Sequence, residues 1–409
     1  MTDVAVILLP GILGSPLVNK FDDGNHIWPV HKPIRLLSVL SADPLQKASW
    51  FVNNMMSMSS LTKALRPVAW KPGDMDFVSR IYSNFVLQNP GKRTCSNGKT
   101  ISFKPHIYVL NYDWSASTLD NLADIAAATE QIRADAWARN KTKQFMYVTH
   151  SMGALPALAN ARALVNDADF LGIVAVAGPI CGTPESLMRM LRGVANDWGD
   201  KTVAKLLADT GWQFAMLAPV LPGFADLLPF DSPRRLADEI KAIIKYHFNI
   251  ARAVKNWYGV SYSWKLGYER QTELIAHMQK SIKAAGRLHR ELRKTQTKLN
   301  KNHKLFAVGL TGLDTVQSMA PMDLSHVTTL RSSKQGALSI PATFPATAYT
   351  FNKQGDGAVP LASQIWGCPQ HAIVDHGIEH GKAFDDSRTW PAIHDGMEWI
   401  FNNRQAASA

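Results

Sequence analysis

The stretch from Phe145 to Val165 constrains the fold of this chain more than any other. An apolar, β-prone run ends at Val148, and an Ala- and Leu-rich run that predicts a helix begins at Ala154. The residues between them, Thr149 to Gly153, leave room only for a sharp turn, and Ser151 lies at its centre. A strand, a sharp turn and a helix in this order predict a parallel sheet covered by helices.

Such a turn is typical of the nucleophile elbow of α/β-hydrolases, which lifts a serine hydroxyl to the edge of the sheet. Gly153, two positions after the serine, is small enough for the helix to pass close to the strand. Thr149 stands two positions before the serine, where the elbow usually has glycine. Ser151 is therefore the predicted nucleophile, and an ordinary strand-to-helix turn is the alternative.

The charge of the chain limits its partners. The 409 residues carry a formal net charge of +11, which suits an anionic membrane, nucleic acid or an acidic substrate. A basic but unspecialised surface is the alternative. The three cysteines, Cys95, Cys181 and Cys368, are odd in number and widely spaced, so we expect a reducing compartment and no metal site.

The N-terminus shows no sign of export. It has neither a basic segment nor a cleavage-site pattern, so it is not expected to be a signal peptide. No apolar run is long enough to cross a bilayer. We therefore expect a cytoplasmic protein, with peripheral membrane contact as a further option.

The first predicted strand, Val4 to Leu9, is apolar throughout and so reads as buried and parallel. It leads into Pro10-Gly-Ile-Leu-Gly-Ser15. In α/β-hydrolases the loop after an early strand supplies one backbone N–H of the oxyanion hole, and the residue after the nucleophile supplies the other. The predicted donors are the N–H groups of Ile12 and Met152. A plain Pro-Gly turn is the alternative.

Strands and helices continue to alternate along the core of the chain. Strands are predicted at residues 107–111, 172–178, 305–310 and 371–375, and helices at residues 118–139, with Thr118 or Ser117 as N-cap, and 388–402. The predicted fold class is α/β, an α/β-hydrolase fold. It would have a mostly parallel sheet, helices on both faces and a helical cap insertion.

Two regions do not fit the core sheet. Residues 20–105 form a lid-like excursion with a Met-rich apolar stretch, which suits either an adaptable lipid-facing surface or a small core. Residues 185–304 form the helical cap insertion, and an apolar loop at 216–230 is a predicted pocket wall. The core is then residues 1–184 and 305–409.

The end of the insertion, residues 274–301, predicts a basic amphipathic helix. Apolar residues recur at three- to four-residue steps, and the other faces carry Lys280, Lys283, Arg287, Arg290, Arg293, Lys294, Lys298 and Lys301. Such a helix can lie on an anionic membrane or pack as a cap helix on the core. Nucleic-acid binding is disfavoured, because no recognition motif accompanies the charge.

Several ordered motifs resemble the lecithin:cholesterol acyltransferase family of α/β-hydrolases, which includes phospholipid:diacylglycerol acyltransferases and related phospholipases. The resemblance rests on Pro10-Gly-Ile-Leu-Gly-Ser-Pro-Leu17, Tyr112-Asp-Trp114, His150-Ser-Met-Gly153, Pro179-Ile-Cys-Gly-Thr183, Gly355-Asp-Gly-Ala-Val-Pro360 and His376-Gly-Ile-Glu-His380. It covers the hydrolase core and not the inserted regions. Ser115 stands where the family has arginine after Tyr-Asp-Trp, so no role of that arginine is transferred.

The resemblance implies the other members of a catalytic triad. Asp356 matches the family's acid, and its flanking glycines free the backbone so that the carboxylate can turn inward. A simple Asp-Gly turn is the alternative. His380 matches the family's catalytic histidine, with His376 as the alternative. Ser151, Asp356 and His380 then follow the chain order of an α/β-hydrolase triad.

The predicted activity is serine-dependent hydrolysis or transfer of an acyl ester by an esterase, lipase, phospholipase or O-acyltransferase. Ser151 would attack a lipid or other ester and form an acyl-enzyme, which water or an alcohol resolves without any metal or organic cofactor. Hydrolysis is favoured, because transfer requires a site that excludes water. The alternative function is non-catalytic binding of a lipid or a partner on a hydrolase scaffold.

Overall fold

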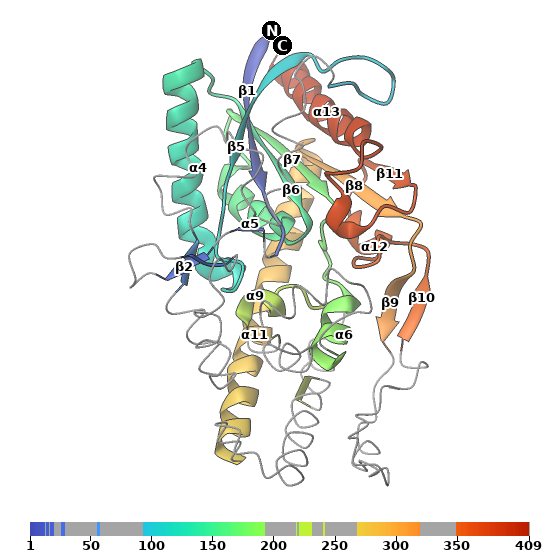
Figure 1. Ribbon diagram of the computed structural model, residues 1–409. Coiled ribbons are helices and arrows are strands. Elements are labelled where there is room, and N and C mark those ends of the chain that lie inside the picture. The colour runs from blue at the N-terminus through green and yellow to red at the C-terminus, as the bar shows by residue number, and fades with distance from the viewer. Residues whose placement is uncertain are drawn as a thin grey trace.

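The computed structural model consists of a central sheet with helices packed around it (Figure 1). It describes residues 1–12, 14–15, 17–19, 26–28, 55–57, 93–192, 218, 221–230, 240–241, 268–319 and 349–408. Most of the predicted excursion and of the Met-rich stretch lies outside these residues, as does much of the predicted insertion. The predicted division into a core and a cap insertion stays a prediction.

Six parallel strands form the central sheet, in the order β11-β8-β7-β6-β1-β5. They are β1 (Thr2–Leu9), β5 (Phe103–Val109), β6 (Phe145–His150), β7 (Phe170–Val176), β8 (Leu305–Thr311) and β11 (His371–Asp375). The predicted parallel sheet is therefore confirmed. The chain places β5 on one side of β1 and β6 on the other, so the strand order reverses between β1 and β6. Parallel sheets bind ligands beyond the carboxyl ends of the strands at such a reversal.

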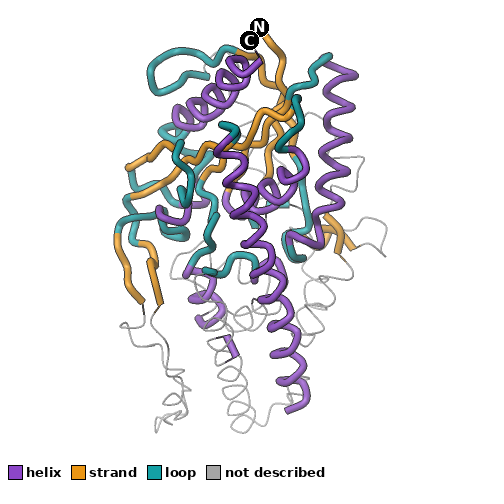
Figure 2. The backbone as a smooth tube through the Cα atoms, turned by 180° about the vertical axis from the view of Figure 1, so that it is seen from behind, coloured by secondary structure: helices purple, strands orange, loops and turns teal. Residues whose placement is uncertain are grey.

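Helices cover both faces of the sheet, as predicted. One face carries α4 (Thr118–Asn140), α5 (Ala154–Leu164) and α11 (Tyr268–Lys301), and the other carries α13 (Trp390–Ser408). Figure 2 shows α11 as a long helix that runs past the sheet and extends beyond its edge. The remaining elements are β2 (Leu17–Asn19), β3 (His26–Trp28), β4 (Met55–Ser57), η2 (Ser151–Gly153), α6 (Pro184–Arg192), α9 (Pro222–Ala225), β9 (Thr315–Met319), β10 (Tyr349–Asn352), α12 (Leu361–Gln364) and η6 (His380–Lys382).

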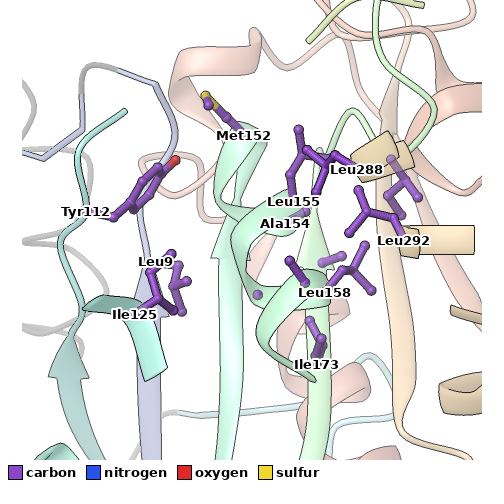
Figure 3. Close-up of a cluster of buried hydrophobic side chains, with 14 of the residues drawn as sticks. Leu9, Tyr112, Ile125, Met152, Ala154, Leu155, Leu158, Ile173, Leu288 and Leu292 are labelled. Carbon is purple, nitrogen blue, oxygen red and sulfur yellow. The ribbon is translucent and has the colours of Figure 1, made fainter. Parts of the chain in front are cut away.

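Strand β1 shows why its sequence is apolar without interruption. Ile7 and Leu9 belong to the cluster under α4, α5 and α11, whereas Val6 and Leu8 belong to the cluster under α13. Successive side chains of a strand point to opposite faces, so a strand covered on both sides must be apolar at every position. Figure 3 shows Leu9 on the α4–α5 side with other members of the first cluster.

The ends of the helices differ slightly from the predicted ones. Ser117, rather than Thr118, is the N-cap of α4, since its side chain accepts a hydrogen bond from the N–H of Asp120 at 3.2 Å. The helix ends one residue later than predicted, and Lys141 closes it in a left-handed conformation. Helix α13 begins at Trp390 and runs to Ser408, so it is shifted beyond the predicted 388–402.

The structure fixes the position of the basic helix α11. Its buried apolar residues join the cluster formed by α4, α5 and the sheet (Figure 3), including Leu288 and Leu292 beside Leu155 and Leu158 of α5. The part of α11 that carries these residues therefore belongs to the main core.

Among the described residues, no helix is both long and apolar enough to cross a membrane.

The contact between α5 and β1 makes a stability prediction at Gly153. A Cβ there would lie 2.4 Å from the carbonyl oxygen of Leu9 and 2.5 Å from that of Pro10, and rigid backbone cannot yield. We expect Gly153→Ala to lower the free energy of unfolding by about 2 kcal/mol or more. Urea unfolding followed by circular dichroism would measure it.

Gly381→Ala is the matched control, because no atom lies within 4 Å of a Cβ added there. Its unfolding midpoint should stay close to that of the unchanged protein. Equal midpoints for both variants would contradict the close approach of α5 to the end of β1.

Candidate active site

Ser151 follows β6 directly as the first residue of the short helix η2, and η2 leads directly into α5. Its φ of 54° is in the left-handed region, which residues other than glycine rarely adopt. Strain of this kind persists only where the surrounding structure holds it, and it is concentrated at functional sites. The predicted strand, turn and helix are therefore present, with the serine at the strained position.

The loop after β1 passes directly against this turn. A Cβ added at Gly11 would lie 2.8 Å from the Cβ of Ser151 and 3.3 Å from its hydroxyl oxygen. Only glycine therefore lets this loop come so close. Ile12 follows in a half-buried turn, and Met152 is fully buried. Ile12 and Met152 are the two predicted oxyanion residues. Ile12 follows the glycine that lies against Ser151, and Met152 is the next residue in the chain after Ser151.

The structure brings Ser151, His380 and Asp356 into one line of hydrogen bonds. The Nε2 of His380 lies 2.7 Å from the Oγ of Ser151, and the Nδ1 of the same ring lies 2.7 Å from Oδ2 of Asp356. The serine comes from the end of β6, the aspartate from the loop after β10, and the histidine from η6 after β11. Segments far apart in the sequence thus meet at the carboxyl edge of the sheet.

The carboxylate of Asp356 is buried but well supported. Its Oδ1 accepts hydrogen bonds from the N–H groups of Ala358 at 3.1 Å and Val359 at 2.8 Å. The backbone carbonyl of Asp356 also accepts from the N–H of His380 at 2.9 Å. These contacts leave Oδ2 for the imidazole and fix the carboxylate in the position that an orienting acid requires.

Tyr112 and Trp114, at the end of β5, hold the loop that follows β1. The hydroxyl of Tyr112 donates to the carbonyl of Pro10 at 3.0 Å, and its N–H donates to Oγ of Ser15 at 3.0 Å. The indole N–H of Trp114 donates to the carbonyl of Ser15 at 3.0 Å. Both ends of the loop around Ile12 are thereby fixed. The sequence pointed to Tyr112-Asp-Trp114 only through its position at a predicted strand end and its resemblance to a family motif, and neither indicated this role.

His150 also has a role that the sequence did not indicate. It is buried beside the imidazole of His380, with ring centres 5.1 Å apart, and its Nε2 lies 3.0 Å from the carbonyl oxygen of His380. Burial and, to a smaller extent, the nearby His380 lower the pKa of His150 to about 3. The ring is therefore neutral near pH 7, and its Nε2–H donates to that carbonyl.

The remaining predicted positions are less directly involved. His376 is exposed, and the structure shows no hydrogen bond from its ring to Ser151 or Asp356. Thr149, at the usual glycine position, is fully buried within β6. Ser115 replaces the arginine of the resembling family, and its hydroxyl donates to Asp113 at 2.6 Å.

The described residues contain no group of three or more His, Cys, Asp or Glu side chains that could hold a metal ion. The three cysteines are free thiols. Burial raises the pKa of both Cys95 and Cys368 to about 11. Neither thiol is therefore ionised enough near neutral pH to compete with Ser151 as a nucleophile.

The buried His150 predicts a pH dependence of stability. Its pKa is about 3 in the folded state and about 6.5 when unfolded, so the unfolded chain binds an extra proton between these values. The contribution of this histidine to stability is full above pH 6.5 and falls as the pH drops towards 3. We expect His150→Gln, which keeps an N–H donor but cannot titrate, to flatten the slope of unfolding free energy against pH in this window.

Urea unfolding at several pH values between 4 and 7 would measure the slope. The exposed His376, changed to Gln, is the control and should leave the slope near that of the unchanged protein. If His150→Gln and the unchanged protein give parallel profiles, His150 is not held neutral in the fold.

Comparison with known proteins supports the fold. No protein-family model matches the chain, and no curated protein sequence matches it. Among solved structures, it is similar to a chain in the crystal structure of the Tle4-Tli4 complex, with a TM-score of 0.58 and 14% sequence identity. The match covers 98% of this chain and 99% of that chain. With the parallel sheet and its elbow, this likeness confirms the predicted α/β-hydrolase fold.

Proposed function

We propose that this protein hydrolyses acyl esters of lipids by way of an acyl-enzyme on Ser151. The observation that carries the proposal is the continuous hydrogen-bond line from Ser151 through His380 to Asp356, with both bonds at 2.7 Å. A buried carboxylate, an imidazole and a strained serine in this order form the arrangement that activates a hydroxyl for nucleophilic attack.

The proposed mechanism gives each of these atoms a role. His380 Nε2 takes the proton of the Ser151 hydroxyl as Oγ attacks the ester carbonyl, and the same nitrogen then gives the proton to the leaving alcohol. Asp356 Oδ2 holds the Nδ1–H tautomer and stabilises the positive ring. Water, activated by His380, then attacks the acyl-enzyme and frees the acid and the serine.

The oxyanion of each tetrahedral intermediate needs donors that are already in place. The proposed donors are the backbone N–H groups of Ile12 and Met152, which belong to the loop against Ser151 and to the residue after it. Tyr112 supports this assignment because it holds Pro10, two residues before Ile12. Losing one such donor typically lowers turnover about a hundredfold or more.

Hydrolysis suits the site better than acyl transfer. The His380 side chain is 19% exposed, so water can approach the base that would activate it. The lipid assignment rests on the resemblance of the motifs to the lecithin:cholesterol acyltransferase family and on the apolar, partly buried Ile12 in the loop against Ser151. The similar chain of known structure comes from the Tle4-Tli4 complex, so a protein partner is a further candidate for this chain.

Ser151→Ala tests the nucleophile. The variant loses only one hydroxyl, at a residue that is 6% exposed, and it should fold normally. Its ester cleavage should fall by about a millionfold, to background. Turnover of a short-chain ester and labelling by a serine-reactive fluorophosphonate would both be measured. A folded variant that keeps turnover and labelling would place the nucleophile elsewhere. A native protein that neither labels nor cleaves would instead be a binding protein.

His380→Ala tests the base. Turnover should fall nearly as far as in Ser151→Ala, because the residues act as a unit. The control, His376→Ala, removes an exposed ring four residues away and should keep most of the activity. The reverse ranking of the two variants would move the base to His376.

Adding an alcohol acceptor to the same assay would separate acyl transfer from hydrolysis.

A further inference from the structure

Helix α11 carries one row of basic side chains along its exposed side. The row, called here the basic ridge, consists of Lys280, Lys283, Arg287, Arg290, Lys294, Lys298 and Lys301, and all are exposed. At 3.6 residues per turn these positions fall within an arc of about 80° and extend over about 30 Å of helix. Charge that served only solubility would be scattered over the exposed surface, so a row this narrow needs a separate explanation.

The opposite side of α11 is used for packing. Its buried apolar residues, Met278, Ile282, Ala285, Leu288, Leu292 and Leu299, belong to the cluster beneath α5 and the sheet. The helix therefore has no free apolar stripe from Met278 onward, and it cannot lie in a bilayer as an amphipathic helix does. It is also held against rotation, so the basic ridge points outward permanently.

Little of this charge is neutralised within the part of the chain that the structure describes. Lys294 has an acidic partner, Glu291 at 2.8 Å, and the same carboxylate also holds Arg162 of α5 at 3.0 Å. The other members of the basic ridge form no ion pair with a described residue. Arg293 is not a member: its guanidinium lies over the ring of Trp366 and donates to the carbonyl of Phe230.

The basic ridge begins beside the candidate active site. Leu288 packs near Leu155, one turn after Ser151 on α5 (Figure 3). Lys280 and Lys283 precede Leu288, so they lie further along the helix in the direction in which α11 extends past the carboxyl edge of the sheet (Figure 1). An object that contacts this half of the basic ridge therefore lies next to the carboxyl edge of the sheet, where Ser151 is.

We propose that the basic ridge docks the protein on the headgroups of an anionic lipid bilayer. This rests on the proposed function, because such a surface contains the lipid esters that Ser151 would cleave. A straight row of mostly lysine charges matches a flat target with diffuse charge. It presents no aromatic anchor of the kind that protein interfaces and single-stranded nucleic acid need. The net charge of +11 acts in the same direction.

The test compares two variants that lose the same charge. The ridge variant changes Lys280, Lys283, Arg287 and Arg290 to Gln. The control variant changes Lys99, Lys104, Lys141 and Lys143, which are also exposed and lie away from α11. Binding to phosphatidylcholine vesicles with and without phosphatidylserine would be measured by flotation, at low and high salt. Turnover of a short soluble ester and thermal unfolding would be measured on the same samples.

We expect the native protein to bind the phosphatidylserine vesicles in low salt only. Each basic side chain near an anionic leaflet strengthens adsorption about fivefold, so the ridge variant should bind at least about tenfold more weakly and the control variant much less so. All three proteins should unfold alike and turn over the soluble ester equally.

Three results would overturn the proposal: vesicle binding unchanged in the ridge variant, equal losses in both variants, or binding to soluble polyglutamate or single-stranded DNA but not to vesicles. Binding as expected without any turnover of esters would instead overturn the proposed function and leave the docking surface in place.

Discussion

The close approach of two backbone segments between β1 and β6 is the constraint on which the rest of the site depends. At this reversal of the strand order, Gly153 lies against the carbonyls of Leu9 and Pro10, and Gly11 lies against Ser151. At both positions an added Cβ would lie too close to its neighbours, so the two glycines determine how closely α5 and the loop after β1 approach each other. The strained backbone of Ser151 is held between them.

Other loops of the structure are hydrogen-bonded to this region. From β5, Tyr112 and Trp114 hold the two ends of the loop after β1. From the opposite edge of the sheet, His380 is held by hydrogen bonds at all four of its polar groups: its two ring nitrogens, its backbone N–H and, through His150, its backbone carbonyl. In the proposed mechanism, an imidazole restrained in this way would lose little entropy when it accepts the serine proton, which is the advantage of a preorganised base.

Local patterns were sufficient to predict the sheet and the elbow, whereas Asp356 and His380 were indicated by motifs that resemble the lecithin:cholesterol acyltransferase family. Ser151 follows a buried strand and precedes a helix, and Asp356 is flanked by glycines. The supporting contacts have no such signature. Tyr112 reaches Pro10 across 102 residues, and His150 binds a backbone carbonyl, which every residue possesses. Partners of this kind depend on the register of the strands, which residue types do not specify. The choice of Ser117 over Thr118 as a cap depended likewise on backbone angles.

The distance in sequence between Ser151 and His380 has a consequence for the chain during its synthesis. Their hydrogen bond joins residues 229 positions apart, and His380 follows β8 and β11 in the sequence. A ribosome therefore completes the elbow long before it adds the imidazole, and at 5–20 residues per second the interval is roughly ten to fifty seconds. During that time the nascent chain holds Ser151 without the imidazole of His380. On the proposed mechanism, the newly made polypeptide cannot cleave esters until β11 is paired with β8.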